Sequence, residues 1–181
     1  MANLEGVFTA LVTPFKNGEV DWTSLKKLVR HQLDGGVSGL VVGGTTAESP
    51  TLSSEEKQKI FDYVKAESGH AVPLVMGTGS NSTAETIAAT KKAKAWGADA
   101  ALVVVPYYNK PSQRGLFLHY QAVAREGGLP VILYNVPSRT ITKLDLSTIQ
   151  DLSRVPGIVA IKEASGDLEF GGQIASTTNL M

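Results

Sequence analysis

One lysine of this sequence stands where an amine nucleophile would be useful. Lys162 directly follows an apolar run at residues 157–161. Burial disfavours the ammonium form of a lysine, and only the neutral amine can attack a ketone to form a Schiff base. Taken alone, a lysine at the end of a strand more often extends its charged head into water along an apolar surface. Both interpretations stay open at this point.

A glycine-rich segment with the sequence GGTTAES, at residues 43–49, brings two adjacent hydroxyl groups to the end of another apolar run. Glycines permit close approach of the backbone, and Thr45 and Thr46 add hydroxyl donors, a combination that suits a carboxylate. The alternative is an ordinary turn in which a threonine caps the next helix. This segment by itself favours that alternative.

Aromatic hydroxyl groups follow two further apolar runs. Tyr107 and Tyr108 lie in the segment PYYNKPS, and Tyr134 ends a run that is followed by Arg139. A phenol can carry protons, and an arginine can bind a carboxylate through two parallel hydrogen bonds. For Tyr107 and Tyr108, burial against a neighbouring helix or subunit explains the segment about as well. For Tyr134 and Arg139 taken alone, a core tyrosine and a surface arginine are somewhat favoured. Their common position after apolar runs favours a shared site.

The apolar runs recur at a spacing typical of successive βα units. They are continuous and rich in β-branched residues, which predicts parallel strands buried on both faces, at residues 7–12, 39–43, 73–77, 101–105, 130–134 and 157–161. Amphipathic stretches between them predict helices at residues 21–33, 54–67, 83–96, 113–126 and 143–152. Ser53 with Glu56 and Ser82 with Glu85 fit the capping-box pattern, which marks two of these helix starts.

Repeated βα units fit either an open doubly wound sheet or a (β/α)₈ barrel. An open dinucleotide-binding fold should carry G-x-G-x-x-G after its first strand, but the nearest segment, Gly77-Thr78-Gly79, lacks the third glycine. The sequence therefore predicts an α/β fold of the TIM-barrel type. About six of the eight βα units are present, so residues 1–181 are expected to form one partial catalytic domain without the C-terminal part of the barrel. Reactive groups of such barrels lie at the C-terminal ends of strands.

The composition excludes some classes of binding partner and metal site. Lys plus Arg and Asp plus Glu number 17 each, which argues against nucleic acid or an acidic membrane as a partner. Cysteine is absent, which fits the cytoplasm and removes thiolate metal sites. We predict packing or surface roles, and no metal site, for the scattered His31, His70 and His119. No signal peptide or apolar run of membrane-spanning length is present.

Four segments together resemble the dihydrodipicolinate synthase family of pyruvate-dependent Schiff-base aldolases. They are GGTTAES at 43–49, PYYNKPS at 106–112, LYNVPSRT at 133–140 and IKEASGD at 161–167. The resemblance implies a TIM-barrel lyase that condenses pyruvate with L-aspartate 4-semialdehyde on the diaminopimelate route to lysine. It also implies that no cofactor is used and that the protein is a homo-oligomer, usually a tetramer.

The resemblance implies catalytic roles for individual residues. Lys162 would form the imine with the ketone of pyruvate. Tyr134 would act as general acid and base and would exchange protons with the hydroxyl group of Thr46. Tyr108 would reach into the site of a neighbouring subunit and complete that proton relay.

Binding roles follow from the same resemblance. Thr45 and Thr46 would hold the carboxylate of pyruvate, and Arg139 that of the semialdehyde. Many family members are inhibited by lysine at a subunit interface, and the matching positions here are Ser49, Pro50, Asn81, Glu85 and Tyr107. Ser54 and Lys57 stand where some lysine-sensitive members have histidines. An added cation should weaken binding of a cationic effector, so we expect weak or absent inhibition.

One departure and two alternatives accompany the resemblance. Ala47 replaces a glycine that is usual in the family, which is a small change only if its φ is negative, as we expect. The Thr45-Thr46 pair and Arg139 favour the synthase over its lyase relatives. Another pyruvate-dependent aldolase that uses a different aldehyde stays open, as does a barrel fragment that binds a partner without catalysis.

Overall fold

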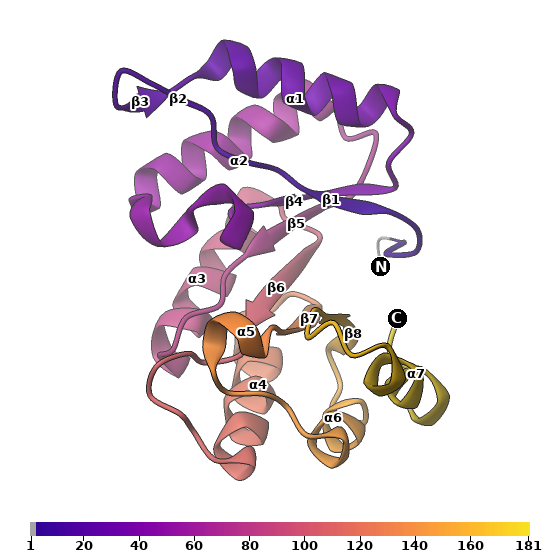
Figure 1. The fold of residues 1–181 in the computed structure, drawn as a ribbon. Coiled ribbons are helices and arrows are strands. Elements are labelled where there is room, and N and C mark those ends of the chain that lie inside the picture. The colour runs from indigo at the N-terminus through magenta and orange to yellow at the C-terminus, as the bar shows by residue number, and fades with distance from the viewer. Residues whose placement is uncertain (1–2) are drawn as a thin grey trace. The chain divides into compact units, whose positions relative to one another are not determined.

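The structure is a computed structural model that describes residues 3–181, and the chain divides into two compact units. Unit 1 takes the chain up to Gly77 together with Trp96–Asp99, and unit 2 comprises Thr78–Ala95 and Ala100–Met181. In each unit, parallel strands alternate with helices along the chain (Figure 1). The expectation that residues 1–181 act as one catalytic domain stays a prediction.

Unit 1 has parallel strands in the order β1 (Phe8–Ala10), β4 (Gly39–Val42) and β5 (Leu74–Gly77). Every residue of β4 is buried, as a strand covered on both faces requires. Helix α1 (Trp22–Asp34) follows β1 and helix α2 (Ser54–Ser68) follows β4, and the two helices lie side by side (Figure 1). The predicted positions of these elements are confirmed to within a few residues.

A small hairpin in unit 1 was not predicted. It pairs β2 (Phe15–Lys16) with β3 (Glu19–Val20) in antiparallel fashion. Its turn residues Asn17 and Gly18 have φ of 55° and 82°, and a tight hairpin turn with the right twist needs positive φ at both positions. Strands of two residues are too short to show the alternation of apolar and polar residues from which strands are predicted.

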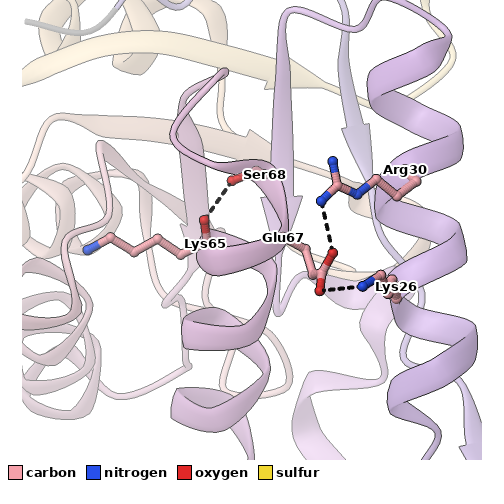
Figure 2. Close-up of polar contacts among 5 residues, drawn as sticks. All are labelled: Lys26, Arg30, Lys65, Glu67 and Ser68. Carbon is pink, nitrogen blue, oxygen red and sulfur yellow. Dashed lines mark hydrogen bonds and ion pairs between the residues drawn. The ribbon is translucent and has the colours of Figure 1, made fainter.

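An ion-pair cluster joins α1 to α2. The carboxylate of Glu67 lies 3.2 Å from Nζ of Lys26 and 3.2 Å from Nη2 of Arg30 (Figure 2). Burial by itself would raise the pKa of Glu67, but the hydrogen bonds and charges of Lys26 and Arg30 together lower it. Lys65 points to the other side of α2, and its carbonyl oxygen accepts a hydrogen bond from the hydroxyl of Ser68 (Figure 2).

Unit 2 has parallel strands in the order β6 (Ala100–Val104), β7 (Val131–Asn135) and β8 (Ile158–Glu163). Helix α3 (Thr83–Trp96) precedes β6, and helix α4 (Gln113–Gly127) connects β6 to β7. These elements also match the predicted ranges closely. The long apolar runs of the strands and the periodic helical stretches made them the most predictable parts of the unit.

Three shorter helices complete unit 2: α5 (Pro137–Thr140), α6 (Leu146–Leu152) and α7 (Leu168–Thr177). The helix predicted to begin at residue 143 begins at Leu146 instead. The backbone N–H of Asp145 donates to Oε1 of Gln113, a hydrogen bond to α4 that holds the chain before this helix. That tertiary contact delays the helix start and could not be anticipated from local sequence.

The two predicted capping boxes have different outcomes. At α2, Ser53 Oγ accepts from the N–H of Glu56 and the Glu56 carboxylate accepts from the N–H of Ser53, so this box is confirmed. At α3, Ser82 Oγ accepts from the N–H of Glu85, but the Glu85 carboxylate accepts from the hydroxyl of Ser80. The second box is therefore only half formed, because a nearby hydroxyl competes for the carboxylate.

Buried polar side chains lie between the elements of unit 2. Tyr120 of α4 is completely buried and donates to the carbonyl oxygen of Val103 at 3.1 Å, and its burial raises the pKa of the phenol. The neighbouring His119 packs edge-on against Tyr120 and shares a 2.9 Å hydrogen bond with Thr83 of α3. Burial lowers the pKa of His119 to about 4. His119 therefore has the packing role that was predicted.

Within residues 3–181, no helix is both long enough and apolar enough to cross a membrane. In the same range, no group of three or more His, Asp or Glu side chains is arranged to hold a metal ion.

Candidate active site

The predicted nucleophile and the predicted proton carrier lie together in unit 2. Tyr134 on β7 and Lys162 on β8 are paired across the two strands. Nζ of Lys162 lies 4.5 Å from the centroid of the Tyr134 ring, a distance at which a cation is attracted to the face of an aromatic ring. Tyr134 is only 6% exposed. The structure therefore joins two residues that lie far apart in the sequence.

The sequence left open whether Lys162 is buried or extends its charged head into water, and in the structure its side chain is exposed. β8 pairs with β7 along one edge. At its other edge, within the described residues, it bonds only to Met181, which donates to Val159 and accepts from the N–H of Ile161 at 2.8 Å. Because only Met181 bonds along this edge among the described residues, the amine of Lys162 is accessible to solvent. An apolar run before a lysine predicts a buried strand, but it does not predict what covers the strand's end.

A bulge in β8 brings Lys162 opposite Tyr134. Val131 pairs with Ile158, but the next residue of β7, Ile132, pairs with Ala160, so Val159 is an extra residue in β8. Had the pairing continued without the bulge, Ile161 would stand opposite Tyr134. Lys162 would then be paired one position further on, where side chains point to the other face of the sheet.

Tyr108 lies in a strained loop of unit 2 and points into solvent. Its side chain is 85% exposed and its φ is 73°, an unusual value for a bulky residue. The N–H of Asn109 donates to the carbonyl oxygen of Tyr107 at 2.9 Å, which closes a three-residue turn around Tyr108. The side-chain amide of Asn109 also donates to the carbonyl oxygen of Asn81. Strain of this kind persists only where surrounding contacts hold it, and it is frequent at functional sites.

Arg139 lies on the short helix α5, which begins directly after the segment that follows β7. Its N–H and the hydroxyl of Thr140 both bond to the carbonyl oxygen of Val136, at 2.9 and 3.0 Å. The helix ends at Ile141, which has a φ of 65° and is 71% exposed. The guanidinium is exposed, so it is accessible to an anionic group in solution.

The hydroxyl pair belongs to unit 1. Thr45 and Thr46 are exposed and lie in a 3₁₀ turn, η1 (Thr45–Ala47), that follows β4. Ala47 is buried, and its carbonyl oxygen accepts a 2.9 Å hydrogen bond from the hydroxyl of Thr13. The positive φ of this turn falls at Glu48 and not at Ala47, so the expectation of a negative φ at Ala47 is confirmed.

Two glycines of unit 1 hold the start of this turn. A Cβ atom on Gly77 would collide with the backbone carbonyl of Gly43, so the ends of β4 and β5 approach each other as only glycine allows. Gly43 itself has a φ of 65°. Close backbone contact therefore sets where the Thr45-Thr46 turn begins.

The five positions that match a lysine effector site are divided between the units. Ser49 and Pro50 lie in unit 1, within a second 3₁₀ turn, η2 (Ser49–Thr51). In unit 2, Asn81 is tied to the Tyr107 loop through Asn109, and the Glu85 carboxylate accepts from Ser80. Burial lowers the pKa of Lys57 on α2. The structure thus brings together Asn81 and the loop that carries Tyr107.

Two polar residues next to the candidate site were not predicted from the sequence. Asn135 directly follows Tyr134, is 1% exposed, and donates its amide to the carboxylate of Glu163, which directly follows Lys162. A signal was present, since an amide and an acid each follow a predicted catalytic residue. The pairing of the strands was needed to show that the two side chains meet.

Parallel strands that alternate with helices, with polar groups following the strands, place this chain in the class of (β/α) barrel proteins. The sequence model of the dihydrodipicolinate synthetase family matches residues 3–180, and the chain belongs to that family. A 4-hydroxy-tetrahydrodipicolinate synthase from Bdellovibrio bacteriovorus is 58% identical over 174 residues, which cover 96% of this chain and 59% of that protein.

Solved structures agree with this assignment. A dihydrodipicolinate synthase from Bacillus anthracis is similar with a TM-score of 0.94 and 46% identity, covering 98% of this chain and 61% of that one. The chloride-inhibited dihydrodipicolinate synthase from Acinetobacter baumannii complexed with pyruvate gives a TM-score of 0.93 at 46% identity, with 97% and 61% covered. The predicted TIM-barrel type of fold is confirmed, and the chain spans about three-fifths of these relatives' length.

Proposed function

We propose that this chain carries the pyruvate-activating site of a 4-hydroxy-tetrahydrodipicolinate synthase, which condenses pyruvate with L-aspartate 4-semialdehyde in lysine biosynthesis. The observation that carries the proposal is the Lys162 amine, 4.5 Å from the ring centroid of Tyr134 at the ends of two paired strands. Family membership supports it, as does the pyruvate bound to the Acinetobacter baumannii relative.

The reaction begins at the amine of Lys162. Its nitrogen adds to the C2 carbonyl of pyruvate, and loss of water leaves a protonated imine. This imine draws electrons from the neighbouring methyl group, which loses a proton and becomes the nucleophilic end of an enamine. The enamine carbon then bonds to the aldehyde carbon of the semialdehyde, whose oxygen takes up a proton while the imine re-forms. Attack of the semialdehyde's own amino group on the imine carbon closes a ring and releases the Lys162 amine. Because the imine itself accepts the electrons, the chemistry requires no metal or cofactor.

Tyr134 is the proton carrier of this proposal. A phenol titrates near ~10, so at neutral pH it moves protons best when neighbouring hydroxyl groups exchange them with it. We assign that exchange to Thr46 and to Tyr108, the latter acting in the site of a neighbouring subunit. The 85% exposure of Tyr108 supports a role outside its own chain.

Substrate carboxylates are bound by the remaining predicted residues. The hydroxyls and backbone N–H groups at Thr45 and Thr46 suit the carboxylate of pyruvate, and both side chains are exposed. The exposed guanidinium of Arg139 suits the carboxylate of the semialdehyde. A cytoplasmic homotetramer is the proposed working form, with the family pattern as its support.

Trapping of the imine tests the proposal. The folded chain is incubated with pyruvate and borohydride, and intact mass and peptide mapping then locate any reduced pyruvyl adduct. We expect one adduct, on Lys162, that is absent from Lys162→Met and unchanged in Lys143→Met, which removes another exposed lysine of unit 2. A folded wild-type sample without an adduct would contradict the proposal and would favour a barrel fragment that does not catalyse.

The aldehyde substrate is tested separately, because any pyruvate-dependent aldolase would form the same adduct. Without borohydride, consumption of pyruvate by the folded chain is compared between aspartate 4-semialdehyde and sugar-derived aldehydes as the second substrate. Faster turnover with the semialdehyde, lost in Arg139→Met, supports the synthase. Faster turnover with a sugar-derived aldehyde would favour a different aldolase of the same superfamily.

A further inference from the structure

A second polar pair lies on the face of the sheet opposite Lys162 and Tyr134. Asn135 and Glu163 are paired across β7 and β8 at the next position along the strands. Consecutive residues of a strand point to opposite faces, so the lysine and phenol face one way while the amide and carboxylate face the other. One pair of strand ends therefore carries the reactive groups on one face and a polar pair on the other.

The contacts of this pair connect three segments of unit 2. Asn135 Nδ2 donates to Glu163 Oε2 at 2.6 Å, and Asn135 Oδ1 accepts from the N–H of Leu144 at 3.0 Å. Glu163 Oε1 accepts from the N–H of Ser165 at 2.6 Å. The carbonyl oxygen of Asn135 also accepts from the N–H of Ala164 at 2.8 Å. Each side-chain oxygen and nitrogen named here has a specific partner, so the geometry of the pair is defined.

The Asn135–Glu163 contact depends on the register in which β8 pairs with β7. The bulge at Val159 means that β8 pairs with β7 in one register before the bulge and in another after it. A slip of one residue would place Ile161 opposite Tyr134 and would turn Lys162 to the other face. The Asn135–Glu163 contact exists only in the register that follows the bulge, since a slip would also remove Glu163 from Asn135.

We infer that Asn135 and Glu163 form a register clamp, a positioning pair that holds Lys162 against Tyr134 by fixing how β8 pairs with β7. The consequence for catalysis rests on the proposed function, whereas the effect on the position of Lys162 does not. Neither residue contacts substrate in this inference, and each acts through the strand that carries its neighbour.

Exchange of the hydrogen-bond donor and acceptor between positions 135 and 163 provides a specific test. In Glu163→Gln, an NH₂ group replaces one carboxylate oxygen. This NH₂ faces either the donating amide of Asn135 or the N–H of Ser165, and because two donors cannot bond to each other, one hydrogen bond is lost. In Asn135→Asp, two carboxylates face each other. The double variant exchanges donor and acceptor: Asp at 135 accepts from Gln at 163 and from Leu144, and Gln at 163 still accepts from Ser165. Glu169→Gln is the matched control, because it removes an exposed acid from the adjacent helix α7.

Two measurements separate positioning from catalysis. The first is the NMR shift of the Lys162 ε-methylene protons in lysine-labelled protein, which the Tyr134 ring current moves only while the two side chains are in contact. Lys162→Met assigns that signal. The second is the rate of borohydride-trapped adduct formation with pyruvate, divided by the folded fraction from circular dichroism, so that a general loss of stability does not lower it.

The clamp predicts the same pattern in both measurements. Each single variant loses the ring-current shift and forms adduct ~10-fold more slowly, as expected for loss of a charged hydrogen bond, and the double variant regains both. Glu169→Gln matches wild type. If the single variants keep the shift and the rate, the clamp is wrong while the proposed function stands. If wild type forms no adduct but the shift is lost and regained as described, the proposed function fails while the clamp stands.

Discussion

Units 1 and 2 present their functional groups in different ways. In unit 1 the candidate groups, Thr45 and Thr46, lie in a turn beyond the end of β4. In unit 2, Tyr134 and Lys162 lie within β7 and β8 themselves, where strand pairing fixes the position of each side chain. In the proposed function, hydroxyl groups that hold the pyruvate carboxylate lie on a turn, whereas the imine-forming lysine and its neighbouring phenol have the rigidity of two paired strands.

The units also differ in what holds them together. Unit 1 relies on the close approach of Gly43 and Gly77 and on the Glu67 ion pairs. Unit 2 relies on buried polar side chains, including His119 and Asn135. We therefore expect the largest effects on reactivity and on acid stability from substitutions in unit 2, and mainly effects on general stability, with a small acid dependence at Glu67, from those in unit 1. Four predictions test this contrast.

The largest expected effect follows from removal of one hydroxyl group in unit 2. Tyr134→Phe should slow adduct formation by ~100-fold, because a positioned acid–base group contributes at least that much. The ring that faces Lys162 is kept, so the melting temperature should change little. Tyr63→Phe, which removes a hydroxyl from an aromatic pair of unit 1, is the control. Equal slowing in both variants would remove the distinction between the units.

Acid should weaken unit 2 through His119. Its pKa falls from 6.5 to about 4 on folding because of burial. Between those values the unfolded state binds the proton and the folded state does not, so the free energy of unfolding decreases as the pH is lowered through this window, by roughly 3 kcal/mol. Urea unfolding of wild type and His119→Phe from pH 7 to pH 4 measures the difference. The exposed His31→Gln should keep the wild-type slope.

In unit 1, a single methyl group should test the glycine contact. Gly77→Ala places a Cβ on the carbonyl of Gly43 and should reduce the free energy of unfolding by about 2 kcal/mol. Gly44→Ala is a matched control, because its φ is −77° and its new Cβ would lie 3.7 Å from Val41, an ordinary contact. Urea unfolding measures the free energy of unfolding of both variants, and we expect a loss only in Gly77→Ala. An equal loss in the two would show that the close approach is not the cause.

The smallest effect is expected at Glu67, also in unit 1. Its folded-state pKa is lowered, so the stability it contributes is present at neutral pH and is lost as the pH falls below the usual range of a glutamate, near ~4.3. Glu67→Gln should lower the melting temperature slightly at low salt and not at high salt, because surface ion pairs are screened. Glu55→Gln, at an exposed position of the same helix, is the control. A loss that persists in high salt would contradict an ion-pair origin.

Local sequence predicted the regular elements well where the pattern was long. The six parallel strands and the helices α1 to α4 were found from apolar runs and periodicity, and Ser53 with Glu56 marked one helix start correctly. The β2–β3 hairpin and α5 were missed because they contain two to four residues each. A pattern cannot be recognised over so few positions.

The candidate site was predicted as a set of residue types after strands, and its geometry was not. That Lys162 and Tyr134 would be close followed from their places at strand ends, but the exposure of Lys162 did not. Asn135 and Glu163 each directly follow a predicted catalytic residue, but they were overlooked because the sequence does not show that the two side chains meet. Only their 2.6 Å contact gives them a role.

The sequence by itself determined the family, the alternation of strands and helices, and the residue types available for imine chemistry. These follow from local order along the chain, namely apolar runs, glycines and hydroxyl pairs. Tertiary structure alone decided that Lys162 faces Tyr134, because the bulge at Val159 shifts β8 by one residue against β7. A side chain changes face with every residue along a strand, so one inserted residue decides which groups meet, and register depends on contacts between segments far apart in the chain.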